Sequence, residues 1–160
     1  MPSRRPTQRS LRATDRIEDE ALRFLARKDR TEAQVRAFLS RKGASEAQTR
    51  RLIRDFIRKG YVNDPGYAWR WAEARLARRP MGRERLEAEL LTQGIAGGTV
   101  AETVERLYRG RSEREMARRL LDGRRDVRTS RDPARAVRLL RQHGFSDETI
   151  ESIVREDQPA

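Results

Sequence analysis

Arginines are the most prominent side chains of this 160-residue chain that could bind a ligand. The chain holds 37 Lys and Arg residues against 25 Asp and Glu, and its formal net charge is +12. An arginine guanidinium is planar and carries several donors, so it suits the oxygens of phosphates and carboxylates. An unevenly basic surface is typical of proteins that bind a polyanion, most often nucleic acid or a protein that carries it. Charged side chains that merely cover solvated helix faces are the alternative.

The basic residues are concentrated in two parts of the chain. Residues 16–62 have a net charge of +6, and residues 109–141 hold twelve arginines against five acidic residues. We select the clusters near the repeat junctions as candidate positions for binding a partner or DNA. They are Arg27, Lys28, Arg41, Lys42, Arg75, Arg78, Arg79, Arg118, Arg119, Arg124, Arg125, Arg128, Arg138 and Arg141.

Catalytic chemistry finds little support in the sequence. His143 is the only histidine and precedes Gly144, so we expect it to bond to carbonyls at a helix end rather than to act as a general base. The densest acidic group, Glu84, Glu87 and Glu89, alternates with arginines and indicates surface ion pairs. No spacing typical of metal ligands or of a phosphate-binding glycine loop is present. We expect no enzyme, no catalytic residue, no metal and no cofactor.

The elements that must position these residues repeat with a period of about 50 residues. Each copy has a helix-start position and, twelve residues later, a glycine; the pairs are Thr31 and Gly43, Gly82 and Gly94, and Asp132 and Gly144. Thr or Asp can cap a helix, and the glycine allows the left-handed backbone that ends it. Ser45 and Ser146 can cap the helix that follows, whereas Ala96 cannot.

Apolar or small residues recur at equivalent positions of the three copies, where one helix face must be buried. These triples are Val35, Leu86 and Ala136; Leu39, Leu90 and Leu140; and Ile53, Val104 and Val154. A further helix precedes each pair, over residues 18–28, 67–78 and 112–121, and the second of these follows a predicted tight turn at residues 63–66. The third copy has a longer, basic connection between residues 121 and 132.

These patterns predict an all-α protein built as an elongated array of three tandem three-helix repeats, with about nine helices. Only 36% of the residues are hydrophobic and 39% are charged, which disfavours one large core. The expected parts are a disordered basic tail at 1–15 and repeats at 16–62, 63–110 and 111–157. The chain has no cysteine, no signal-type apolar run and no membrane-length segment, so we expect a cytoplasmic protein.

Trp69 and Trp71 lie on a predicted helix that is apolar nearly all round. One interpretation is that neighbouring helices cover this helix on both sides. The other is that one tryptophan stays exposed and stacks on a base or on a partner residue.

Several short motifs, in this order and spacing, resemble the RecX family of regulatory proteins over roughly residues 16–157. They are Ala21-Leu22-x-x-Leu25-Ala26-Arg27, Lys42-Gly43, Gly60-Tyr61-Val62-Asn63-Asp64 with Tyr67-Ala68, Gly82-x-x-Arg85-Leu86-x-x-Glu89-Leu90-x-x-x-Gly94-Ile95, and Leu139-Leu140-x-x-x-Gly144-Phe145-Ser146. Ala44 departs from the pattern, since the other copies have Ile95 and Phe145 there.

The resemblance implies a non-enzymatic modulator of the RecA recombinase. Family members bind RecA, usually inhibit its ATPase, strand-exchange and co-protease activities, and are thought to lie along the groove of the RecA filament on single-stranded DNA. The expected partners are therefore the RecA filament and single-stranded, and also double-stranded, DNA; we expect a monomer and no membrane.

The rival hypothesis is a non-specific DNA-binding protein. The helices on either side of Lys42, Gly43, Ala44 and Ser45 have the layout of a helix-turn-helix. The second helices of the three copies share no basic pattern, however, because Arg50, Arg51 and Arg54 have acidic or small counterparts such as Glu102, Glu105 and Glu151. Recognition of a DNA sequence by three equivalent modules is therefore disfavoured. Non-specific binding to DNA phosphates remains an alternative.

Overall fold

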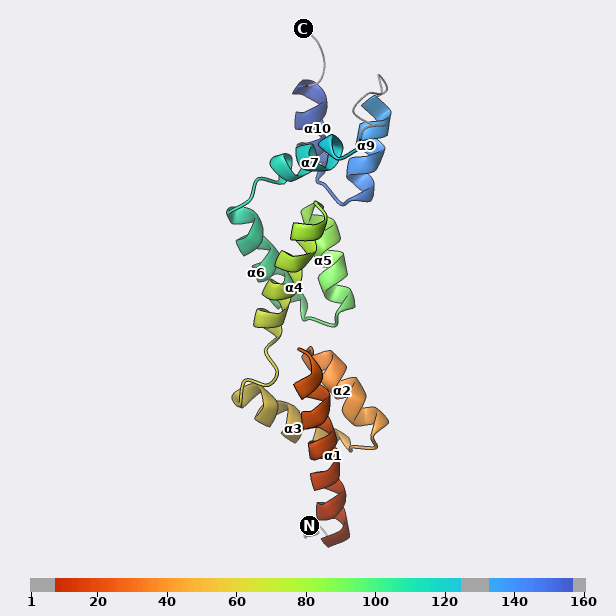
Figure 1. Cartoon of the computed structure of the whole chain (residues 1–160), viewed down its shortest axis with the longest axis vertical. Coiled ribbons are helices and arrows are strands. Elements are labelled where there is room, and N and C mark those ends of the chain that lie inside the picture. The colour runs from red at the N-terminus through yellow and green to blue at the C-terminus, as the bar shows by residue number, and fades with distance from the viewer. Residues whose placement is uncertain (1–7, 125–132, 157–160) are drawn as a thin grey trace. The chain divides into compact units, whose positions relative to one another are not determined.

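The computed structural model describes residues 8–124 and 133–156, and all regular structure in these ranges is helical (Figure 1). The predicted all-α class is therefore confirmed. The nine helices of these ranges form three modules: α1 (Gln8–Arg27), α2 (Glu32–Arg41) and α3 (Glu46–Arg58); α4 (Asp64–Arg78), α5 (Arg83–Thr92) and α6 (Gly97–Arg109); and α7 (Glu113–Asp122), α9 (Pro133–Gln142) and α10 (Asp147–Glu156). The chain divides into two compact units, Met1–Tyr67 and Ala68–Ala160.

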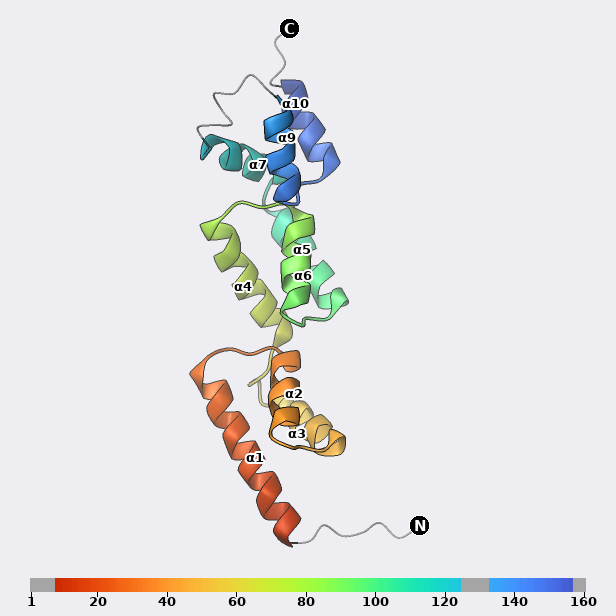
Figure 2. The same ribbon diagram turned by 90° about the vertical axis from the view of Figure 1, so that its right-hand side faces the viewer.

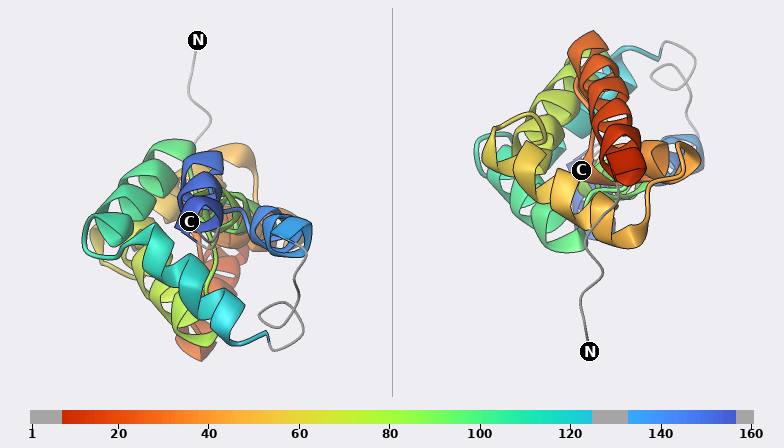
Figure 3. Two further views of the ribbon diagram at one scale, coloured as in Figure 1. Left: turned by 90° about the horizontal axis from the view of Figure 1, so that it is seen from above. Right: turned by 90° about the horizontal axis from the view of Figure 1, so that it is seen from below.

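In unit 1, helix α2 packs against both α1 and α3 (Figures 2 and 3). The rings of Phe24 on α1 and Phe38 on α2 stack with their centroids 4.4 Å apart. The core of the unit comprises Ala21, Val35, Leu39, Leu52, Ile53, Phe56 and Val62. Burying each of the larger aliphatic side chains contributes about 1.5 to 3 kcal/mol.

Reciprocal caps start two helices of the first module at the predicted residues. The Thr31 hydroxyl accepts from the Gln34 N–H at 3.2 Å, and the Gln34 side chain accepts from the Thr31 N–H. Ser45 and Gln48 form the same capping box at the start of α3. Each cap stabilises its helix by about 1 kcal/mol.

Left-handed glycines end the helices as predicted, with φ of 82° at Gly43, 79° at Gly94 and 70° at Gly144. This conformation lets the next N–H turn back onto the last helical turn. Phe145 accordingly donates to the Leu140 carbonyl at 3.2 Å and is 2% exposed. The small or apolar residue after each glycine therefore packs beneath the helix that has just ended.

In unit 2, α5 packs on α6, and α10 packs on α7 and α9. The predicted apolar triples are buried at Leu86, Leu90, Val104 and Leu140. Two positions of the third module differ from the prediction, because Ala136 and Val154 are only half-buried. The residues of α7 predicted to share one face, Met116, Ala117, Leu120 and Leu121, are all buried.

Two local predictions differ from the structure. Helix α1 begins at Gln8, so residues 8–15, predicted as disordered tail, are helical; no proline or glycine interrupts the chain between Pro6 and Gly43, and a packed helix extends readily through such residues. The predicted turn at residues 63–66 instead starts α4. Asn63 accepts from the Gly66 N–H at 2.9 Å, and a proline suits a first helical turn.

The first residue of one module caps the middle helix of the module before it. In unit 1, the Glu32 N–H at the start of α2 donates to the Asp64 carboxylate at 2.8 Å. In unit 2, the Arg83 N–H at the start of α5 donates to the Glu113 carboxylate at 2.9 Å. Burial raises the pKa of Asp64, and the bond from Glu32 opposes that rise. These carboxylates satisfy amides that the helices themselves leave unpaired.

At the start of α5, the backbone of Gly82 contacts the backbone of His143 and Gly144. The Gly82 N–H donates to the His143 carbonyl at 2.8 Å, and a Cβ placed on Gly82 would lie 1.9 Å from the Gly144 carbonyl oxygen. This contact explains why the second copy has glycine where the first has Thr31. A capping side chain does not fit, and the Glu113 carboxylate caps α5 instead.

The substitution Gly82→Ala should therefore destabilise unit 2 by at least about 2 kcal/mol, since the clash involves backbone that cannot move aside. Urea unfolding followed by tryptophan fluorescence measures the change, because Trp69 and Trp71 both lie in this unit.

Gly98→Ala is the matched control. A Cβ on Gly98 meets nothing within 4 Å, and the residue lies in the first turn of α6. This control should be neutral or stabilise by up to about 1 kcal/mol. Equal effects of the two substitutions would contradict the close backbone contact.

Candidate partner-binding surface

The predicted binding residues of unit 1 lie at the ends of α1 and α2. Arg27, Lys28 and Arg41 are exposed. The Lys42 ammonium is also exposed but lies 2.5 Å from the Glu20 carboxylate. The hydrogen bond from Lys42 is the main reason why the pKa of Glu20 falls below its usual value. Lys42 therefore already has an anionic partner.

A groove of about 730 Å³ lies beside these residues, lined by side chains of α1 and α2. Its lining mixes both signs of charge: the cations are Arg16, Arg23, Arg27 and Lys42, and the acids are Asp15, Asp19 and Glu20. The mixture makes the groove a poor match for a uniformly negative strand.

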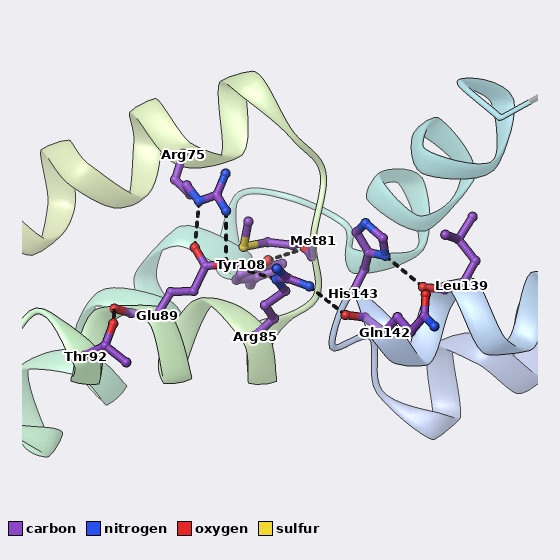
Figure 4. A network of polar contacts seen from close by, with 9 residues as sticks. All are labelled: Arg75, Met81, Arg85, Glu89, Thr92, Tyr108, Leu139, Gln142 and His143. Carbon is purple, nitrogen blue, oxygen red and sulfur yellow. Dashed lines mark hydrogen bonds and ion pairs between the residues drawn. The ribbon is translucent and has the colours of Figure 1, made fainter.

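In the second module, Arg75 belongs to a network that joins α4 to α5 (Figure 4). Its guanidinium binds Glu89 through two hydrogen bonds, of 2.6 and 3.1 Å, and Arg85 binds the same carboxylate at 2.9 Å. These bonds lower the pKa of Glu89, with the bond from Arg75 as the largest cause. The other two predicted residues differ in exposure: Arg78 is exposed and Arg79 is half-buried.

In the third module, some predicted residues are engaged by carboxylates. Arg118 and Arg114 of α7 both pair with Glu156 of α10. Arg141 lies 3.3 Å from Asp147 across the turn between α9 and α10. These pairs hold the helices of the module to one another.

The remaining predictions of the third module are surface residues or lie outside the described ranges. Arg119, Arg124 and Arg138 are exposed. Arg125 and Arg128 fall within residues 125–132, which the structure does not describe. Of the predicted binding residues in the basic connection between α7 and α9, the structure therefore describes only Arg124.

His143 serves the fold, as predicted. The residue is 4% exposed, and Nδ1 lies 2.9 Å from the Leu139 carbonyl, which can only accept the bond (Figure 4). Burial lowers the pKa of His143, and the positive charges of Arg79, Arg85 and Arg124 lower it further. The buried imidazole therefore favours its neutral form.

The structure differs from both interpretations of the tryptophan helix. Helix α4 buries only Ala68, Ala72 and Leu76, which form one stripe four residues apart. Trp69 and Trp71 are both half-buried. The Arg106 guanidinium lies 4.4 Å from the centre of the Trp69 ring, a cation–π contact that occupies one face of this ring.

The sequence-based choice of binding residues does not include the arginines of α3. Arg50, Arg51 and Arg54 are exposed on the first module but lie away from the repeat junctions that define the predicted clusters. A signal for them exists in the sequence, because spacings of three and four place these residues on one side of a helix.

The protein-family and structural comparisons agree with this architecture. A family model described as the first three-helix domain of RecX matches residues 19–54, which lie in α1 to α3. The regulatory protein RecX of Thermobifida fusca (strain YX) is 32% identical over 104 residues. The predicted resemblance to the RecX family is confirmed. The aligned part is 63% of this chain and 56% of that RecX protein, so the chain spans little more than half the length of this curated relative.

Solved RecX structures share the fold. The crystal structure of RecX from Lactobacillus salivarius superposes with a TM-score of 0.82 at 21% identity, over 91% of this chain and 97% of that one. A second crystal structure, of a regulatory protein RecX, gives a TM-score of 0.77 at 15% identity, over 98% and 83% of the two chains. The tandem three-helix architecture is therefore that of RecX.

Membrane-spanning and metal-binding features are both missing from the described residues. None of the helices there is long and apolar enough to cross a membrane. In the same ranges, no three His, Cys, Asp or Glu side chains converge in a way that could hold a metal ion.

Unit 2 should lose stability as the pH falls below neutrality. The unfolded chain protonates His143 at its ordinary pKa of about 6.5, whereas the folded chain resists the proton. Stability is thus fully present above the unfolded pKa and is lost as the pH falls toward the lower folded pKa. The urea midpoint, measured by tryptophan fluorescence, should decrease between about pH 7.5 and about pH 5.5.

A His143→Leu variant is the control, since it has no histidine and the carboxyl groups titrate mostly below this range. Its midpoint should be nearly flat over the same interval, whatever its absolute stability. An unchanged slope in the variant would remove His143 as the cause.

Proposed function

We propose that this chain is a non-enzymatic regulator that binds RecA and its filament on single-stranded DNA and inhibits ATP hydrolysis, strand exchange and co-protease activity. The observation that carries the proposal is the joint match of sequence and fold to RecX proteins, the curated one of which is named a regulatory protein. We place this activity in the cytoplasm, in recombination, DNA repair and the SOS response, and expect the protein to act as a monomer.

The exposed basic residues support a partner that is negatively charged. Arg27, Lys28 and Arg41 of the first module and Arg119 and Arg124 of the third are exposed and, within the described part of the chain, have no ion pair. Such charges raise the rate of encounter with an acidic surface and are screened by salt. Among the residues predicted from the sequence, we propose these, rather than Arg75 or Arg118, as the cationic contacts.

The decisive experiment adds this protein to RecA filaments preassembled with ATP on single-stranded DNA and follows ATP hydrolysis. Binding to the same DNA without RecA is measured in parallel over a salt series. Inhibition well below the concentration that binds bare DNA is the expected result. Inhibition only where bare DNA is already coated would favour the second candidate, a non-specific DNA-binding protein, for which the basic exposed side of α3 is the specific observation.

Replacing Arg124, Arg125 and Arg128 with Ala should raise the concentration for half-inhibition by roughly fivefold, if the basic connection meets the filament. Circular dichroism should remain helical. The matched control, called here the paired-arginine control, replaces Arg16, Arg109 and Arg155, exposed arginines that already pair with carboxylates. It removes the same charge, so equal effects of the two variants would remove the connection from the proposal.

A further inference from the structure

The exposed side of α3 carries a row of arginines. Arg50, Arg51, Arg54 and Arg58 are all exposed, and their spacings of three and four residues place them on one side of the helix. They extend over about 12 Å of helix axis. The opposite side faces the core of unit 1 through Leu52, Ile53 and Phe56. We call this row, together with Ile57 and Tyr61, the α3 face.

The row is largely uncompensated. Arg58 lies 2.8 Å from Asp55, but within the described residues no hydrogen bond or ion pair engages the guanidinium of Arg50, Arg51 or Arg54. Three neighbouring cations without counter-charges repel one another modestly. The α3 face is therefore not arranged to stabilise the helix.

The other modules show that the fold does not need these charges. In the second module, helix α6 packs on α5 as α3 packs on α2, yet the positions of Arg50, Arg51 and Arg54 hold Ala101, Glu102 and Glu105. In the third module, α10 has Glu151 and Ser152 at the first two positions and Arg155 at the third. Only the first module presents an unbroken basic row on this helix.

An aromatic ring stands at the end of the row. Gly60 has a φ of 76°, and the Tyr61 N–H turns back to the Phe56 carbonyl at 2.8 Å. The Tyr61 ring rests near the ring of Phe56, with centroids 6.3 Å apart, and the residue is 52% exposed. Ile57 beside it is 47% exposed. The backbone and one ring contact thus hold Tyr61 in place and leave much of it open.

We propose that the α3 face binds single-stranded nucleic acid, with Arg50, Arg51 and Arg54 on successive phosphates and Tyr61 stacked on one unpaired base. A basic track with an aromatic platform is the combination that binds single strands without reading sequence. An acidic protein surface could pair with the arginines but would offer no flat ring on which Tyr61 could stack. The bases of a duplex stack on one another and are not available to Tyr61. The assignment deepens the proposed function, because it names the contact with the DNA strand of the filament, and it is testable without RecA.

The first test measures the fluorescence anisotropy of a labelled thymidine oligonucleotide as the full chain is added. Replacing Arg50, Arg51 and Arg54 with Ala should weaken binding at least roughly tenfold and reduce the slope of log affinity against log salt by about 2, or about 0.7 for each phosphate that is no longer neutralised. Replacing the three with Lys, which keeps the charges, should retain the salt slope. The paired-arginine control should change affinity less than about twofold.

The second test isolates the aromatic ring. Tyr61→Ala should weaken single-strand binding roughly fivefold or more, whereas Tyr61→Phe keeps the stacking surface and should bind as wild type does. Neither substitution should alter binding to a duplex of the same length. This difference between strands is one that a general loss of structure or charge would not produce.

Several outcomes would overturn the assignment. Unchanged binding by the arginine variant would remove the α3 face as the binding site. An equal loss in the paired-arginine control would leave only long-range attraction by the net charge. A variant that binds bare DNA normally but fails to inhibit RecA would make the α3 face a protein contact. A wild-type chain that shows the predicted DNA binding but never inhibits RecA would refute the proposed function and leave this site intact.

Discussion

The architecture depends on the free backbone amides at the start of the middle helices, α2 and α5. The first N–H groups of a helix have no partner within it, and an amide buried without an acceptor costs about 1 to 3 kcal/mol. Asp64 and Glu113 each supply that acceptor from the first turn of the following module. Glu113 also accepts from the hydroxyls of Ser146 and Thr149, so one carboxylate joins the starts of three helices. In both cases a hydrogen bond links the first turn of one module to the middle helix of the module before it.

Much of the fold could be predicted because the signals are local. Gly43, Gly94 and Gly144 end helices for a conformational reason that is visible in the residue type, and Thr31 and Ser45 cap for a reason visible within four residues. The hydrogen bond between Glu32 and Asp64 joins residues 32 positions apart, and no local sequence pattern indicates it. The prediction of a turn at the Asn-Asp-Pro-Gly segment is wrong for a related reason, since these residues suit both a turn and the first turn of a helix.

The candidate binding surface is harder to predict, because the sequence shows charged side chains but not the groups with which they pair. Lys42, Arg75, Arg118 and Arg141 belong to basic clusters, and in the structure each lies against a carboxylate from another element. Comparison of the three repeats does not favour the α3 arginines, because all their counterparts in the other modules except Arg155 are acidic or small. A comparison of repeats finds features that all modules share, and it cannot find a basic row that only one module has.

The carboxylate of Asp64 also affects when the first module can complete its folding during synthesis. A chain grown only to residue 62, the predicted end of the first repeat, has all three helices of that module but lacks the acceptor for the Glu32 amide. Five further residues complete unit 1 as the structure defines it, ending at Tyr67. Since chains fold from the N-terminus as they are made, the first and second modules are each completed by the beginning of the next one, and the order of synthesis becomes the order of assembly.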